Sequence, residues 1–140
     1  MSAVAVFITA ANAREARRLA TALVAERLAA CVTDAGVVHS VYRWKGRVER
    51  ARERLLIAKT RRARLAALVA RVKTLHSYDV PEAVALPIVG GNPAYLTWVE
   101  RETDQRATVP STRRGVSRAA DRAATFSITR RPSSSSRNRG

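Results

Sequence analysis

The segment HSYDVPEAVALPIVGGNPAYLTW, residues 76–98, decides the fold because it places a loop, a strand, a turn and a helix in quick succession. Residues 83–89 are β-rich, and Pro87 within them predicts a strand that bends or lies where a missing N–H donor does no harm. Asn92 and Pro93 match the preferred cap and first position of a helix. The segment therefore predicts a strand followed by a short terminal helix.

Two helices and a first strand are predicted upstream of this segment. Residues 3–9 are mostly apolar and β-rich, which is typical of a central strand. Asn12 and Glu15 have the spacing of a capping box, and apolar residues then recur at helical spacing as far as Leu28. A second apolar stripe predicts a helix over residues 62–74.

A long hairpin is predicted between the two helices. Residues 31–44 form a strand with a bulge or bend expected at residues 34–36, and residues 47–59 supply its partner. Lys45 and Gly46 make the two-residue connection of a tight hairpin. A strand of about 13 residues spans roughly 43 Å, which is far longer than an average strand.

Such a hairpin would extend beyond the rest of its own domain. Its projecting part carries Tyr42 and Trp44, with Leu55 and Leu56 nearby, so it exposes edge hydrogen-bond groups and apolar surface unless another chain covers them. Self-association is therefore expected.

The element order is βαββαβ plus a terminal helix, which predicts an α+β ferredoxin-like sandwich. Each βαβ crossover is right-handed, so both crossover helices lie on one face of a single antiparallel sheet. The opposite face of the sheet is left uncovered. This domain is expected over residues 1–103, with a long hairpin between the second and third strands and a C-terminal helix.

Residues 104–140 differ from the domain in composition. They contain nine Arg, seven Ser and only two Asp, with few large apolar residues. Such a segment cannot bury enough surface to offset the entropy of ordering, which predicts a disordered Arg/Ser-rich tail. Nonspecific attraction of the tail to nucleic acid at low salt is expected, whereas specific nucleic-acid recognition is not.

Cysteine content and hydropathy bear on the compartment. Cys31 is the only cysteine, and a lone thiol fits a reducing compartment, so a cytoplasmic protein is predicted. Its apolar neighbours predict a buried structural thiol. No segment approaches the roughly 20 apolar residues that span a bilayer, so no membrane association is expected.

Motifs for catalysis are absent from the sequence. It has no nucleophile elbow, no phosphate-binding glycine loop and no carboxylate pair, so the protein is not expected to be an enzyme. It has no paired cysteines and no histidines at helical metal-ligand spacing. The strands also lack the aromatic platform on which RNA-recognition motifs stack bases.

The residues His76 and Glu82 are the main candidates for ligand binding on local grounds. They stand six positions apart around a bend, so they can approach one another or a cleft at a subunit boundary. A structural role is the alternative: His76 would end the second helix, and Glu82 would pair with a basic neighbour such as Lys59.

The chain resembles the CutA divalent-cation-tolerance family. The resemblance rests on ERLAACVT at residues 26–33, SVYRWKGRVERARERLLIAKT at residues 40–60 and the segment at residues 76–98. It extends over about residues 4–102. It implies a non-catalytic homotrimer, in which long hairpins pair between subunits and the open sheet faces meet, with a role in metal homeostasis.

The resemblance also implies a ligand cleft between subunits. Trp44 and Tyr78 would form its walls, with Lys59 as an anion partner and His76 beside them. Glu82 would be the metal ligand. No cofactor is required, but a divalent cation such as copper is an expected ligand. Two positions depart from copper-binding members, which have a cysteine where this chain has Ile8 and a histidine where it has Leu75.

The alternative to a metal-binding role is a signalling or scaffold role. In this case the protein is again a non-catalytic trimer, but it binds a small anionic effector or a protein partner and ignores metals. The residues of the sequence leave both alternatives open.

Overall fold

Four strands form one antiparallel sheet in the order β2-β3-β1-β4. The computed structural model describes residues 2–105. The strands and helices, in chain order, are β1 (Ala3–Ala10), α1 (Ala13–Ala25), β2 (Cys31–Trp44), β3 (Arg47–Arg61), a 3₁₀ turn (Arg62–Arg64), α2 (Leu65–Leu75), β4 (Ala83–Pro87) and α3 (Pro93–Glu102). This order and topology confirm the predicted βαββαβ arrangement with a C-terminal helix.

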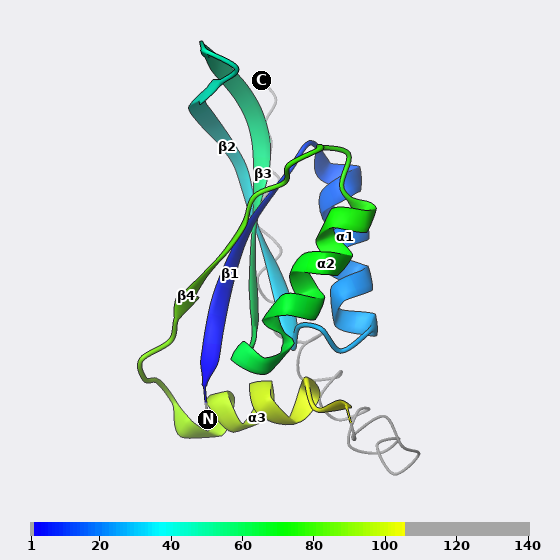
Figure 1. Cartoon of the computed structure of the whole chain (residues 1–140). Coiled ribbons are helices and arrows are strands. Elements are labelled where there is room, and N and C mark those ends of the chain that lie inside the picture. Colours follow the sequence, from blue (N-terminus) through cyan, green and yellow to red (C-terminus); the bar gives the residue numbers. More distant parts are fainter. Residues whose placement is uncertain (1, 106–140) are drawn as a thin grey trace, which may run out of the picture. The chain divides into compact units, whose positions relative to one another are not determined.

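The core lies between one face of the sheet and the helices α1 and α2. Figure 1 shows both helices on the same face, and the hairpin β2–β3 projecting beyond them. Alternate residues of β1 and β3 point into this core, because side chains along a strand alternate between its two faces. The largest fully buried apolar side chains are Ile8, Leu19, Leu23, Leu56, Leu68, Val6, Val72 and Val99. Val24, which the helical pattern placed on the apolar stripe of α1, is instead 42% exposed.

The helix caps form as the sequence predicts. The Asn12 side chain accepts a hydrogen bond from the backbone N–H of Glu15 at 2.9 Å, and α1 begins at the next residue. The Asn92 side chain accepts from the N–H of Ala94 at 3.0 Å, and Pro93 occupies the first turn of α3. Each cap satisfies one N–H that has no partner within its helix.

The long hairpin also matches its prediction. The β2–β3 pairing shifts register between Asp34 and Val37, and the N–H of Gly36 donates to the Asp34 carboxylate at 2.9 Å. At the tip, Lys45 and Gly46 have positive φ angles of 50° and 80°. Positive φ at both central residues is the requirement of a type I′ turn, whose twist matches that of the strands.

Several element boundaries differ from the prediction by a few residues; α1, for example, ends at Ala25 although its apolar pattern continues to Leu28. The first turn of the predicted second helix is a 3₁₀ turn, and α2 proper begins at Leu65. The strand β4 ends at Pro87, two residues earlier than predicted, with Pro87 paired to Val4 at the sheet edge. Pro87 lies where its missing N–H does no harm, as predicted, because the N–H of the next residue, Ile88, still donates to the carbonyl of Ala3 at 3.0 Å.

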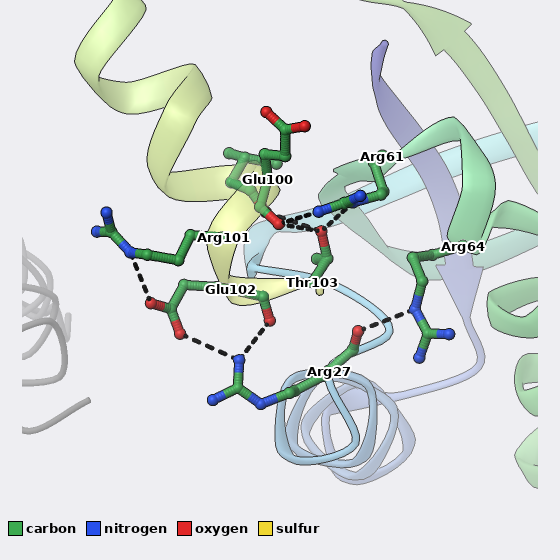
Figure 2. A network of polar contacts seen from close by, with 8 residues as sticks. Arg27, Arg61, Arg64, Glu100, Arg101, Glu102 and Thr103 are labelled. Atoms are coloured by element: carbon green, nitrogen blue, oxygen red, sulfur yellow. Dashed lines mark hydrogen bonds and ion pairs between the residues drawn. The ribbon is translucent and has the colours of Figure 1, made fainter. Parts of the chain in front are cut away.

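Arginines hold the end of α3 against the rest of the domain. Figure 2 shows Arg61 reaching the carbonyl of Glu100 and the hydroxyl of Thr103, while Arg27 Nη1 donates to the carbonyl of Glu102 at 3.0 Å. The Nε of Arg64 in turn donates to the carbonyl of Arg27 at 3.3 Å. Cationic groups at a helix C-terminus satisfy its free carbonyls and favour its dipole.

The predicted disordered tail lies outside the described residues, except for Asp104 and Gln105. It stays a prediction. Within residues 2–105, no helix has the length and apolar character required to cross a membrane.

Candidate ligand site

A buried polar cluster lies where the loop after α2 passes the end of β1. Its centre is His76, which follows the last residue of α2 and whose side chain is fully buried. His76 Nε2 lies 2.7 Å from the carbonyl oxygen of Thr9, and its Nδ1 accepts from the N–H of Tyr78 at 3.1 Å. The ring is therefore the neutral tautomer with its proton on Nε2. Both nitrogens have protein partners, so His76 offers no free lone pair to a metal.

Glu15 is the second member of this polar cluster and is 4% exposed. Its two carboxylate oxygens accept hydrogen bonds from the N–H groups of Ala11, at 2.8 Å, and Ser77, at 2.6 Å. Its Oε1 also lies 3.7 Å from His76 Nδ1. Burial raises the pKa of the Glu15 carboxyl, but several smaller contributions, led by the backbone N–H groups of Ala11 and Ser77, together outweigh burial, so its net pKa lies below the usual value. Glu15 thus ties α1 to the loop that carries His76.

Tyr78 extends the cluster to the hairpin. Its hydroxyl donates to Glu53 at 2.9 Å, and the Ser40 hydroxyl donates to the other oxygen of that carboxylate at 2.7 Å. Glu53 is only 7% exposed. It lies one residue nearer to the hairpin tip than Arg54, which is the last β3 residue that pairs with β1. Tyr78 therefore covers β3 where β1 has ended. Burial, and then the bond to Glu53, raise the pKa of Tyr78 to about 12.

Replacement of Tyr78 by phenylalanine is expected to remove a tyrosine ionisation near pH 12. Because the folded-state pKa exceeds the unfolded value of 10.0, this hydroxyl stabilises the fold below pH 10 and loses that effect as the pH rises to about 12. Tyr78→Phe should also cost about 1 kcal/mol at neutral pH, since Glu53 loses a hydrogen bond. Ultraviolet titration and urea unfolding measure the two effects. Unchanged stability at pH 8 would contradict this role, and Tyr42→Phe is the control, because its exposed ring is 44% accessible.

Lys59 lies apart from this cluster, on the open face of the sheet. Lys59 pairs with Cys31 across strands β3 and β2, and its Nζ lies 3.9 Å from Cys31 Sγ. The Tyr95 hydroxyl, from α3, shares a hydrogen bond with the same sulfur at 3.2 Å. Burial, and then this bond, raise the pKa of Tyr95. Cys31 is half-buried, whereas a buried thiol had been predicted from its apolar neighbours.

Trp44 and Glu82 are exposed, and neither belongs to the polar cluster. Trp44 ends β2 at the hairpin tip, is 45% exposed and has Lys45 Nζ at 5.9 Å from its ring centroid. Glu82 precedes β4 with its side chain in solvent, and no ion pair with Lys59 or another residue forms within residues 2–105. Twelve residues of β3 separate the level of Trp44 from Lys59, or roughly 40 Å.

One chain therefore brings together only His76 and Tyr78 of the five predicted site residues. Their ring centroids are 4.6 Å apart. Across the part of the chain that the structure describes, no three His, Cys, Asp or Glu side chains are grouped so that they could hold a metal ion. A cleft that includes Trp44 or Lys59 beside His76 would require a second copy of the chain.

Sequence reasoning missed Glu15 and Glu53 as members of the cluster. Glu15 had a signal, because a capping-box glutamate is expected to point back over the helix N-terminus. Its bond to Ser77 depends on tertiary packing and had no sequence signal. Glu53 lies in a strand of alternating charge, where it cannot be distinguished from a solvated residue until its hydroxyl partners are known.

Comparison with known proteins now identifies the family. The sequence profile of a family described as "CutA1 divalent ion tolerance protein" matches residues 4–102. The chain is 47% identical over 100 residues to "Protein CutA 1, chloroplastic" from Oryza sativa, a match that covers 71% of this chain and 56% of that protein. The chain thus spans about half the length of this and other curated relatives that it matches.

Solved structures show the same fold. The divalent cation tolerance protein from Thermus thermophilus is 47% identical and superposes with a TM-score of 0.72 over 73% of this chain and 99% of its own. The periplasmic divalent cation tolerance protein CutA from Archaeoglobus fulgidus is 35% identical, with a TM-score of 0.71 over 73% of this chain and 99% of its own. Since such relatives are named chloroplastic or periplasmic, the cytoplasmic location stays a prediction.

The family match covers almost all of the described residues. It includes the three motifs on which the resemblance rested and the whole of the long hairpin. The family is described by divalent ion tolerance and not by an enzymatic reaction, in agreement with the expectation of a non-catalytic protein. The chain belongs to the CutA1 divalent ion tolerance protein family.

Proposed function

We propose that the protein acts in divalent-cation tolerance as a non-catalytic homotrimer, and that it binds a divalent cation or small ligand weakly in clefts between subunits. The observation that carries this proposal is the distance between the predicted site residues: within one chain they lie too far apart to line a single cleft, so such a cleft would need more than one subunit. Glu82 would be the metal ligand, while Trp44, Lys59, His76 and Tyr78 would line the cleft. No cofactor is required for this role.

The uncovered face of the sheet supports the trimer. The cross-strand register places Phe7 beside Ile57 and Val84 on the face opposite the helices. Val84 and Leu86 are 51% and 47% exposed on this face. A contiguous apolar face on a soluble domain is typical of an interface. Closed cyclic symmetry would bury three such faces without leaving one free.

The hairpin supports a site that is shared between subunits. Tyr42 and Trp44 are 44% and 45% exposed near its tip, and β2 is an edge strand. An edge strand with exposed aromatic residues is a surface to which another chain can bind. If this hairpin packs against a neighbouring subunit, Trp44 would lie far from the polar cluster of its own chain and nearer to the polar cluster of the neighbour.

A signalling or scaffold role is the second candidate function, and the state of His76 favours it. Both ring nitrogens of His76 have protein partners, so metal binding at Nδ1 would have to displace the N–H of Tyr78. The Lys59 ammonium lies beside Cys31 and Tyr95, on the face of the sheet opposite α1 and α2, where it could contribute to binding of a small anionic effector. The trimer is common to both candidates.

Calorimetric titration of copper(II) and zinc into the full chain tests the metal role, with oligomeric mass measured by light scattering. We expect a trimer, micromolar binding, and at least a tenfold loss of affinity on Glu82→Ala, since the substitution removes a charged oxygen ligand. Asp79→Ala is the matched control, because Asp79 is an exposed carboxylate of the same loop.

Three outcomes separate the alternatives. Binding that Asp79→Ala preserves and Glu82→Ala abolishes would support the metal site. A trimer that binds neither metal would favour the effector or scaffold role. A monomer would overturn both, because the cleft would then lack its second subunit.

A further inference from the structure

The buried polar cluster contains a hydrogen-bond acceptor that one proton would convert into a donor. Nδ1 of His76 accepts from the N–H of Tyr78 at 3.1 Å, so this nitrogen carries no proton in the structure. Histidine is the side chain that ordinarily gains a proton between about pH 5 and about pH 8. In a protonated imidazole both ring nitrogens are donors. A proton on Nδ1 would therefore face the Tyr78 N–H, and this hydrogen bond could not form.

The other ring nitrogen does not compensate for this loss. Nε2 lies 2.7 Å from the carbonyl oxygen of Thr9, which can only accept, so Nε2 keeps its proton in both charge states. The ring is completely buried, so a proton on Nδ1 needs a protein acceptor rather than water. The carboxylate of Glu15 is such an acceptor, because its Oε1 lies 3.7 Å from Nδ1.

Glu15 can accept from a protonated His76 without losing its present partners. One carboxylate oxygen accepts from the N–H of Ala11 and the other from the N–H of Ser77. A carboxylate has about four lone-pair positions, so Oε1 can also accept from Nδ1 after a small turn of the ring. The pKa of Glu15 lies below its usual value, so this carboxylate is still ionised in mild acid. Protonation thus exchanges the contact with Tyr78 for an ion pair with Glu15.

We propose that protonation of His76 in mild acid releases the backbone of Tyr78 and frees the loop of residues 78–82 to move. The loop up to Ser77 stays attached, because the Ser77 N–H still donates to Glu15. The Tyr78 hydroxyl donates to Glu53 of β3 at 2.9 Å, so movement of Tyr78 is passed on to the hairpin. A single buried proton would in this way change contacts between the loop and β3.

The charges around His76 are few within residues 2–105. The strand β1 has no ionisable side chain along its length. The titratable or charged groups on the elements packed around the ring are Glu15 and Arg18 on α1, Glu53 and Tyr42 on the hairpin, and Tyr78 on the loop itself. Glu15 favours the charged ring at short range, whereas Arg18, which donates to the Leu75 carbonyl, opposes it.

The release of Tyr78 takes place within one chain and needs neither a metal ion nor a trimer. A consequence for ligand binding rests on the proposed function, because only there do Tyr78 and Glu82 belong to a cleft between subunits. Release of the loop would then weaken ligand binding in mild acid. The release and the metal site can each fail without the other.

Nuclear magnetic resonance of the full chain without metal tests the proposal. From about pH 8 to about pH 5.5, we expect the His76 ring to titrate. Over the same interval the Tyr78 amide should lose at least tenfold of its protection from hydrogen exchange, after correction for the intrinsic rate at each pH. The Ser77 amide should stay protected. His39 is the only other histidine and is exposed, so His39→Gln is the matched control and should leave this transition unchanged.

Three further variants assign the transition to named contacts. His76→Gln should abolish it, with thermal melting to verify the fold. Glu15→Gln should move it to lower pH by about one unit, because the charged ring loses its counterion. Tyr78→Phe keeps the N–H, so the amide transition should persist while the amides of Glu53 and Ser40 no longer respond to pH.

Three results would overturn the proposal. The first is a His76 ring that titrates while the Tyr78 amide stays protected, because Glu15 would then absorb the charge without any release. The second is a ring that stays neutral down to about pH 5.5. The third is a transition that persists in a folded His76→Gln variant, since it would then belong to another group.

Discussion

Replacement of Glu15 by alanine is expected to lower the free energy of unfolding by about 3 to 4 kcal/mol. Glu15 is buried and accepts from the N–H groups of Ala11 and Ser77. Alanine leaves both donors without partners, and each buried unpaired donor costs about 1 to 3 kcal/mol. The loop that carries His76 also loses its attachment to α1. Urea unfolding at one fixed protein concentration measures the loss, since oligomer stability depends on concentration.

The pH dependence of the free energy of unfolding distinguishes the contribution of the Glu15 charge from that of the side chain's shape. Its folded-state pKa lies below 4.5, so its contribution is present above that pH and is lost as the pH falls through the folded-state pKa. Glu15→Gln keeps the shape and one acceptor, so it should cost less than alanine and flatten the acid limb of the stability curve. An alanine variant as stable as the parent at pH 7 would show that water satisfies both donors.

Replacement of Ile57 by glutamate is expected to convert the proposed trimer into monomers. Ile57 lies in the middle of the uncovered face, paired with Phe7 on one side and Thr33 on the other. Three symmetry-related glutamates would bring three charges into one apolar interface, and an unpaired buried charge costs several kcal/mol. Within one chain the same side chain stays half-exposed, so the domain itself should fold.

Light scattering and circular dichroism measure these two effects separately. Val24→Glu is the matched control, because it introduces the same charge at an apolar residue that is 42% exposed on α1. We expect this control to be trimeric. If Ile57→Glu also remained trimeric, the uncovered face would not be the interface, and the proposed cleft would lose its structural basis.

Local signals account for most of what the sequence predicted. Caps, turns and bulges depend on a few neighbouring residues, and so Asn12, Asn92, Gly36 and Gly46 identified their elements correctly. The placement of both crossover helices on one face followed from the handedness of the crossovers. The end of β4 was wrong by two residues, because the pattern counted the apolar residues after Pro87, of which Ile88 still makes one hydrogen bond to Ala3 but neither continues the strand.

The contacts of the candidate site could be predicted from the sequence less completely than the fold. Its bonds join residues far apart in the chain, such as Tyr78 with Glu53 and Glu15 with Ser77. Hydropathy cannot distinguish a glutamate that two hydroxyls satisfy from one in water. The proposed roles of Trp44, Lys59 and Glu82 involve a second chain, and neither the sequence nor the fold of one subunit tests them.

The position of β1 at the centre of the sheet determines when the domain can fold during synthesis. The ribosome makes this strand first, yet its neighbours are β3 and β4, and Val4 pairs with Pro87 only after most of the domain has been made. Until then a nascent chain has an apolar strand with an unpaired edge, which favours aggregation. The hairpin β2–β3 pairs locally and can form early, whereas pairing of β1 has to close long loops. Folding is therefore expected to be completed in one late step, and a chain stopped before β4 should depend on chaperones to stay in solution.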